Sequence, residues 1–213
     1  MKCKICDKPV LAFYDNEMKC GLFHCRSCEF IFKDESSYVD EERELRQYQN
    51  HNNSFESPGY VQMFRDFIDT TVTPNRHNIN TVLEFGSGPG PVLSELLRLE
   101  GFNVDSYDKF FAPKKVFEGK SYDLITSTEV IEHIADPLEL FTFFANHLNP
   151  KGCLALMTQF HDNTAEGFLK WWYRKDPTHI CFYRPHTFEV LAERFGFELL
   201  FYDHKKIALL QRK

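Results

Sequence analysis

A glycine-rich turn just before Pro91 is the stretch of this sequence best suited to hold a ligand. Gly86, Gly88 and Gly90 follow a short apolar run and precede leucines at helical spacing. Pro91 suits the first turn of that helix. A strand, a glycine turn and a helix N-terminus together direct backbone N–H groups at a ligand. Glycine is needed there because a Cβ would separate the ligand from the backbone.

The spacing of these glycines favours one class of ligand over another. A dinucleotide site has the pattern G-x-G-x-x-G, whose third glycine allows a pyrophosphate to approach. Pro91 occupies that third position here, so the pattern disfavours a pyrophosphate. Asp108 lies at the predicted carboxyl end of the next strand, where its carboxylate could accept hydrogen bonds from both hydroxyls of a ribose. We therefore favour an adenosyl cofactor without phosphates, whose amino-acid tail lies along the turn.

Cysteines near the start of the chain form a second chemical group. Two C-x2-C pairs lie 18 residues apart, and two such pairs supply the tetrahedral thiolate set that Zn²⁺ prefers. The predicted zinc ligands are Cys3, Cys6, Cys25 and Cys28. We interpret Cys20 and His24 as non-ligating. The stretch resembles a zinc ribbon, and the metal would supply the folding energy that so short a segment cannot obtain from its core.

Alternating strands and helices must position the glycine turn and Asp108. The apolar pattern predicts strands at 81–85, 102–107, 122–126 and 153–158, a closing hairpin of strands at 198–202 and 206–211, and helices from residue 92, at 137–147 and at 185–195. This order is typical of a mostly parallel sheet with helices on both faces. The closing hairpin adds an antiparallel strand.

The chain divides into three predicted parts. They are a zinc-ribbon-like segment at 1–33, a linker with lid or packing helices at 34–77, and the main domain at 78–213. We favour a solvated linker or an exposed helix for the acidic stretch around residues 40–44. An aromatic stripe after residue 58 indicates packing against the main domain. The alternative is a lid over the cofactor, formed by Tyr48, His51, Asn52 and Tyr60.

Composition limits the classes of function. A net charge of −6 without a long Lys/Arg run argues against a general nucleic-acid binder. We expect no membrane span, because no apolar run approaches about 18 residues. Seven cysteines without an export signal indicate a reducing compartment, so we expect a cytoplasmic protein with metal-bound or free thiols.

Four successive motifs resemble those of class I S-adenosylmethionine-dependent methyltransferases. They are Val-Leu-Glu-Phe-Gly-Ser-Gly-Pro-Gly at 82–90, Asp108, the segments 122–126 and 129–137, and Asn-Pro-Lys-Gly-Cys at 149–153. The resemblance covers about residues 78–212. It implies an α/β, Rossmann-like, doubly wound sheet of seven strands with an antiparallel last strand. Only 13 residues separate Asp108 from Tyr122, so we expect a shortened region around strand three, with a residual strand at 115–117.

The resemblance also implies which residues bind the cofactor. The three glycines would line its methionine part, Asp108 its ribose, and the residues after 126 would lie near its sulfonium. Glu84 matches an acidic position that acts through the loop or a water. The predicted set is Glu84, Phe85, Gly86, Ser87, Gly88, Gly90, Asp108, Ser127, Thr128 and Glu129.

The acceptor is expected to bind between residues 159 and 186, where this family builds its acceptor pocket. We expect one of the adjacent Trp171 and Trp172 to pack and the other to face a pocket, because neighbours in sequence do not share a helix face. His161, His179 and, near the methyl group, His133 are the candidate bases. A base is needed only if the acceptor loses a proton, and a structural role competes for each histidine.

Our leading hypothesis is a methyltransferase that acts on a small-molecule or sugar-type acceptor, with oxygen as the target atom. A second hypothesis is an RNA methyltransferase whose zinc ribbon binds RNA. The acidic balance and the lack of an Asn-Pro-Pro-Tyr motif make it second. A third is a non-catalytic interaction protein, in which the zinc ribbon is joined to a domain that keeps the fold but has lost its cofactor. The sequence makes no prediction of the oligomeric state.

Overall fold

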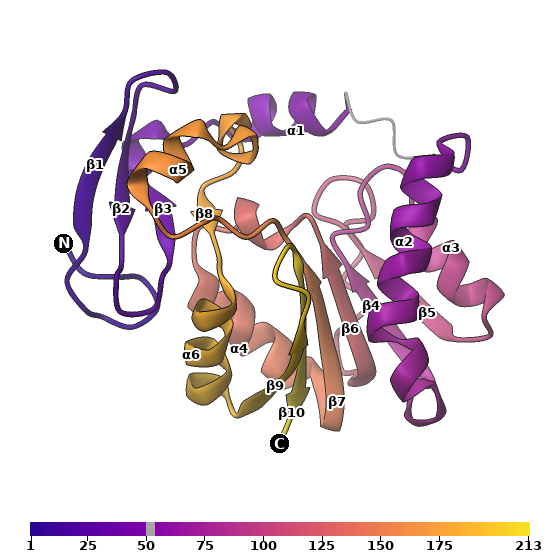
Figure 1. The fold of residues 1–213 in the computed structure, drawn as a ribbon. Coiled ribbons are helices and arrows are strands. Elements are labelled where there is room, and N and C mark those ends of the chain that lie inside the picture. Colours follow the sequence, from indigo (N-terminus) through magenta and orange to yellow (C-terminus); the bar gives the residue numbers. More distant parts are fainter. Residues whose placement is uncertain (50–53) are drawn as a thin grey trace.

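The computed structural model describes residues 1–49 and 54–213. His51 and Asn52, two of the predicted lid residues, lie outside the described residues. A large sheet with helices on both faces stands beside a small sheet near the N-terminus (Figure 1).

The large sheet has the strand order β5-β4-β6-β7-β10-β9. Its strands are β4 (Thr81–Phe85), β5 (Asn103–Tyr107), β6 (Tyr122–Thr128), β7 (Leu148–Met157), β9 (Phe197–Tyr202) and β10 (Ile207–Arg212). The first four are parallel, whereas β10 runs antiparallel to both β7 and β9. This confirms the predicted Rossmann-like class and the closing hairpin.

The third strand of the resemblance is absent, so the large sheet has six strands rather than seven among the described residues. Residues 109–121 form turns and a bridge from Asp108 to Ala112, and the expected strand at 115–117 was wrong. A parallel crossover needs a dozen or more residues before the next strand begins. The 13 residues available cannot supply a helix and a strand as well, so β5 forms the edge of the sheet.

Two helix layers cover the large sheet, and alternation along the strands separates their cores. Val82 and Leu124 pack with α2 (Pro58–Thr71) and α3 (Val92–Leu99), while Leu83 and Ile125 pack with α4 (Pro137–His147) and α6 (Pro185–Phe195). Figure 1 shows the two pairs of helices on opposite faces. The predicted aromatic stripe is therefore a packing surface, because the side chains that α2 buries belong to the first of these cores.

The small sheet contains a strand from the main domain. Its order is β1 (Leu11–Asp15), β2 (Cys20–His24), β3 (Ile31–Lys33) and β8 (Cys181–Phe182), all antiparallel. The pairing of β3 with β8 crosses the predicted boundary at residue 33. Neither β1 nor β8 was predicted, and two residues of β8 are too few for a recognisable alternation.

Further contacts join the N-terminal segment to α6. Thr187 Oγ1 donates to the carbonyl of Cys28 over 2.8 Å, and Arg194 donates to the carbonyl of Ile5 over 2.6 Å. Phe30 packs against Tyr183 with ring centroids 5.1 Å apart. One hydrophobic core therefore extends through both parts.

Shorter elements complete the described chain. They are α1 (Glu41–Gln49), α5 (Ala165–Lys170) and 3-10 turns at Glu35–Ser37, Thr73–Asn78, Ile131–His133 and Trp172–Lys175. Among the described residues, none of the helices has both the length and the apolar character that crossing a bilayer requires.

Candidate active site

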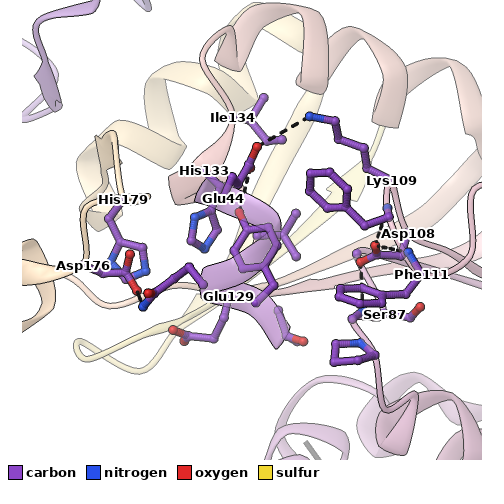
Figure 2. Close-up of a pocket in the computed structure, with 18 of the residues that line it drawn as sticks. Glu44, Ser87, Asp108, Lys109, Phe111, Glu129, His133, Ile134, Asp176 and His179 are labelled. Atoms are coloured by element: carbon purple, nitrogen blue, oxygen red, sulfur yellow. Dashed lines mark hydrogen bonds and ion pairs between the residues drawn. The ribbon is translucent and has the colours of Figure 1, made fainter. Parts of the chain in front are cut away.

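A cavity of about 840 Å³ opens at the carboxyl ends of β4, β5 and β6 (Figure 2). The strand β4 lies between β5 and β6, so the chain leaves it in one direction and later returns on the other side. Open α/β sheets bind ligands at such a switch point. The glycine turn, the loop after Asp108 and the segment from Thr128 to Ile134 all contribute to the walls.

The glycine turn has the backbone that only glycine adopts without strain. Gly86 has φ +86° and Gly88 has φ +63°. A Cβ on Gly86 would lie 2.2 Å from Cγ2 of Val130. The first glycine is therefore required by the closely packed segment after β6, in addition to any ligand.

Asp108 organises the loop that faces this turn. Its Oδ2 accepts a hydrogen bond from Gly88 N over 2.9 Å, and its Oδ1 accepts from Phe110 N and Phe111 N over 2.8 and 3.0 Å. A carboxylate has about four lone-pair positions, so these bonds leave room for about one more. The bidentate ribose contact expected of Asp108 thus requires that one loop bond be replaced.

Most of the predicted cofactor residues line the cavity. These are Glu84, Phe85, Gly86, Ser87, Gly88, Asp108, Thr128 and Glu129. Gly90 and Ser127 do not line it. Ser127 is fully buried in the sheet. Gly90 belongs to the approach to α3, where its carbonyl accepts from Val92 N over 2.8 Å.

Glu84 is a buried carboxyl group at the floor of the cavity. It is 3% exposed and accepts a hydrogen bond from Ser94 Oγ. Burial raises the pKa of Glu84 to about 7, although the Ser94 hydrogen bond acts in the opposite direction. This group therefore titrates close to neutral pH.

Helix α1 spans the cavity from one wall to the other. Lys109 Nζ lies 3.0 Å from Glu41 Oε1 and 3.5 Å from Glu44 Oε2, and Gln47 donates to Asp176 Oδ2 over 3.1 Å. On its inner face Tyr48 lines the cavity, as Tyr60 of α2 does. No residue of this helix is buried, although several of its side chains are partly covered.

Two of the three candidate bases meet in the cavity wall. Nδ1 of His133 donates to the carbonyl of Thr178 over 3.1 Å, and Nδ1 of His179 donates to the carbonyl of Tyr173 over 2.8 Å. Their ring centroids are 4.7 Å apart, and both rings line the cavity. Figure 2 shows them beside Asp176.

The prediction for His161 requires correction, because the structure does not bring it to the cavity. Its Nε2 donates to the carbonyl of Glu29 over 2.9 Å, while its Nδ1 accepts from Asn163 N over 3.0 Å. Burial, followed by the charge of Arg184, lowers the pKa of His161 to about 3. The imidazole of His161 is therefore neutral, 3% exposed and hydrogen-bonded through both ring nitrogens. It stabilises the junction between the main domain and the N-terminal segment.

The sequence analysis missed a group formed by the buried carboxyl group of Glu132, the partly buried carboxyl group of Glu129 and the phenol of Tyr173. Glu129 Oε2 lies 2.9 Å from the hydroxyl of Tyr173, and the same hydroxyl donates to Glu132. Burial, followed by the charge of Glu129, raises the pKa of Glu132 well above its ordinary range. The E-x-x-E spacing after β6 signals that the carboxyl groups share one face of a turn, but no sequence feature indicates that Tyr173 meets them.

The adjacent tryptophans behave as expected. Trp172 is 66% exposed and lines the cavity. Trp171 packs instead against Phe168 and Phe182, with centroid distances of 5.9 and 6.1 Å.

The four predicted zinc ligands form a compact cluster away from the cavity. Sγ of Cys3 is 3.5 Å from Sγ of Cys28, Sγ of Cys6 is 3.4 Å from Sγ of Cys25, and all four lie within 4.8 Å of one another. Sulfurs on one tetrahedral zinc ion stand about 3.8 Å apart, so the cluster is close to that arrangement.

The cysteine and histidine interpreted as non-ligating lie outside this cluster. Cys20 packs in a separate hydrophobic cluster, and His24 Nε2 lies 2.8 Å from Asn163 Oδ1.

Comparison with known proteins agrees with the fold. The family model described as a methyltransferase domain matches residues 42–201. The chain therefore belongs to this methyltransferase family. A search of curated proteins finds no match.

Solved structures share the fold at low sequence identity. The mitomycin 7-O-methyltransferase MmcR is 14% identical, with a TM-score of 0.57 over 81% of this chain and 59% of that one. Magnesium protoporphyrin IX methyltransferase ChlM from Synechocystis PCC 6803, with bound SAH, is 16% identical, with a TM-score of 0.55 over 81% of this chain and 94% of that one. The chain thus spans well under two thirds of MmcR and nearly all of ChlM.

Proposed function

We propose that the cavity transfers a methyl group from S-adenosylmethionine to an oxygen of a small-molecule or sugar-type acceptor. The observation that carries this proposal is that one continuous cavity joins the glycine turn and Asp108 to the wall of His133, His179 and Trp172. A donor and an acceptor can therefore share it.

On the donor side, the chain's own groups suit this cofactor. The turn at Gly86 and Gly88 presents backbone to the cavity, Asp108 retains capacity for a hydroxyl, and Glu84 is a carboxyl group near the end expected to receive an amino group. S-adenosylmethionine supplies an activated methyl group and needs little from the protein beyond orientation and exclusion of water. The side chains of Tyr48 and Tyr60, which line the cavity, would help to exclude water from the cofactor.

On the acceptor side, the lining favours a ring-shaped or aromatic molecule with a hydroxyl group. Trp172, Tyr48 and Phe110 offer flat surfaces, and the two histidines place ring nitrogens beside them. MmcR is by its description an O-methyltransferase that acts on mitomycin, and ChlM acts on a porphyrin. Both relatives in fold accept small molecules, which supports the same class of acceptor here.

Calorimetry with S-adenosylhomocysteine tests the donor side directly. We expect saturable binding that falls at least about 10-fold in Asp108→Ala, because the turn loses its anchor and the ribose its acceptor. Asp105→Asn is the control, since Asp105 lies on β5, three residues before Asp108, but contacts Lys120 and Tyr122 outside this cavity. No detectable binding to the unaltered protein would overturn the proposal.

The acceptor class is tested with labelled S-adenosylmethionine and three panels of substrates. We expect label in hydroxylated small molecules and sugar derivatives, and none in ribosomal or transfer RNA. Label found in RNA would replace this proposal with the RNA methyltransferase hypothesis. Saturable cofactor binding without transfer to any panel would favour the non-catalytic hypothesis.

We also infer that Cys3, Cys6, Cys25 and Cys28 hold one structural zinc ion. The thiolates are brought together in the geometry described above, and their segment shares a core with the main domain. Metal analysis should give about one zinc per chain in the unaltered protein and in Cys20→Ala, but little in Cys28→Ser. Equal zinc content in all three proteins would refute the assignment.

A further inference from the structure

A second group of metal-ligating side chains lies in the wall of the active-site cavity. Glu132, His133 and His179 each offer one ligand atom, and these atoms all lie within 4.8 Å of one another. His133 Nε2 is 3.9 Å from Glu132 Oε1. Ligand atoms on one ion stand about 3.0–3.5 Å apart, so a side-chain adjustment of less than about 1 Å would bring this pair into range.

The histidines are held as metal ligands usually are. In each ring Nδ1 donates to a backbone carbonyl, of Thr178 for His133 and of Tyr173 for His179. A carbonyl can only accept, so the neutral ring carries its lone pair on Nε2. This outer hydrogen bond fixes the tautomer and the orientation of histidines that bind metals.

The carboxyl group is a second, independent indication of a cation. Glu132 is fully buried, and its Oε2 has no hydrogen-bond partner among the described residues. Tyr173 also contacts Glu129, but its one proton can be donated to only one carboxyl group at a time. Of the residues that the structure describes, His133 is the one basic side chain within 4.0 Å of this carboxyl group, and its ring is uncharged in the tautomer described above. The ionised form of a carboxyl group in this position would be costly without a cation beside it, and a bound cation would stabilise that form.

We propose that Glu132, His133 and His179 bind a divalent transition-metal ion at the acceptor side of the cavity. Two imidazoles and one carboxylate, with no thiolate, suit Mn²⁺, Fe²⁺ or Zn²⁺. Both histidines line the cavity, so positions on the ion opposite the protein would face it. The site is distinct from the four cysteines.

The role of the ion rests on the methyltransferase function proposed above. A hydroxyl group coordinated to it would be oriented and made more acidic. His133 and His179 would then act as ligands rather than as bases. The acceptor class expected is one with an oxygen donor able to reach the ion, such as a phenol or a diol.

Electron paramagnetic resonance of added Mn²⁺ tests the site on the intact, zinc-loaded protein. Mn²⁺ is the probe because it competes poorly with Zn²⁺ for thiolates. We expect one site per chain, weakened at least about 10-fold in Glu132→Gln and in His179→Gln. His186→Gln is the matched control, since that exposed histidine pairs with Glu189 outside the cavity, and it should bind Mn²⁺ as the unaltered protein does.

Electron spin echo modulation from ligand nitrogen provides a test that needs no variant. Bound Mn²⁺ should show coupling to imidazole ¹⁴N, whereas an ion held by surface carboxylates would show none and would overturn the proposal. Binding of S-adenosylhomocysteine is measured on the same samples. Cofactor binding with no Mn²⁺ binding refutes the metal site and leaves the proposed methyltransferase function standing.

Discussion

Asp15 Oδ2 lies 2.9 Å from Nη1 of Arg174, and both side chains are almost completely buried. Asp15 ends the first strand of the N-terminal sheet, whereas Arg174 belongs to the 3-10 turn that carries Trp172 to the cavity. The two atoms form an ion pair without the alignment of a hydrogen bond. The N-terminal segment therefore supports, through a buried ion pair, the turn that brings Trp172 to the cavity.

Asp15→Asn should destabilise the protein by about 3 kcal/mol, because it leaves the buried Arg174 guanidinium with only the half-exposed Glu17 as a charged partner. The amide oxygen can still accept the turn bonds that Asp15 Oδ1 receives from Glu17 N and Met18 N, so the change removes mainly charge. Urea unfolding measures the effect. Glu17→Gln is the control, since Glu17 contacts the same arginine but is 55% exposed, and it should cost less than about 1 kcal/mol. Equal costs for the two variants would contradict a buried, functional ion pair.

Gly86→Ala should abolish cofactor binding and destabilise the fold. The variant combines a φ of +86° with a Cβ placed 2.2 Å from Val130, and the two effects together should exceed about 2–3 kcal/mol. Gly101→Ala separates them, because φ there is +93° but nothing lies within 4 Å of the added Cβ. That control should cost only about 1–2 kcal/mol and leave binding of S-adenosylhomocysteine intact. Thermal unfolding and calorimetry give both quantities. A Gly86→Ala protein that binds the cofactor normally would show that the turn tolerates a side chain.

The gathering of the glycine turn and Asp108 at one cavity was predictable from the sequence because its signals are local. The glycine spacing, the following helix and Asp108 at the end of the next strand are each set by a few adjacent residues. The cysteine cluster was predictable for the same reason, since each C-x2-C pair forms one turn around a metal. Turn residues and the order of the strands are therefore enough to predict most of the fold.

The histidines and carboxyl groups on the opposite side of the cavity were predictable only in part, because their positions depend on contacts between distant segments. His161 and His179 look alike in sequence, yet the first donates to the carbonyl of Glu29 in the N-terminal segment and the second lines the cavity. The carboxyl groups of Glu129 and Glu132 acquire their environment from Tyr173 in the same way. The hydrophobic pattern of one segment does not indicate which distant segment it will contact.

The buried carboxyl group of Glu84 should make stability fall as pH rises. Its folded pKa is raised to about 7 from an unfolded value of 4.5, so between these values the unfolded state has released a proton that the folded state retains. Folding then opposes ionisation, and the free energy of unfolding should decrease by up to about 3 kcal/mol across this interval. Glu84→Gln should remove that decrease while its amide oxygen still accepts from Ser94. Urea unfolding of both proteins from pH 4.5 to pH 8 isolates the one group, and identical profiles would show that Glu84 ionises normally in the fold.

The two tryptophans should report ligand binding separately. Trp172 is exposed and lines the cavity, whereas Trp171 packs between Phe168 and Phe182, so a ligand that fills the cavity changes the surroundings of the first far more than of the second. Trp171→Phe leaves Trp172 as the reporter, and we expect its emission to shift or to be quenched on titration with S-adenosylhomocysteine. Trp172→Phe leaves Trp171, whose emission should change little at the same ligand concentration. Because both substitutions keep an aromatic ring, neither should alter stability by more than about 1.5 kcal/mol. A response confined to Trp171 would mean that the ligand enters from the N-terminal sheet and that the cavity wall has been assigned to the wrong tryptophan.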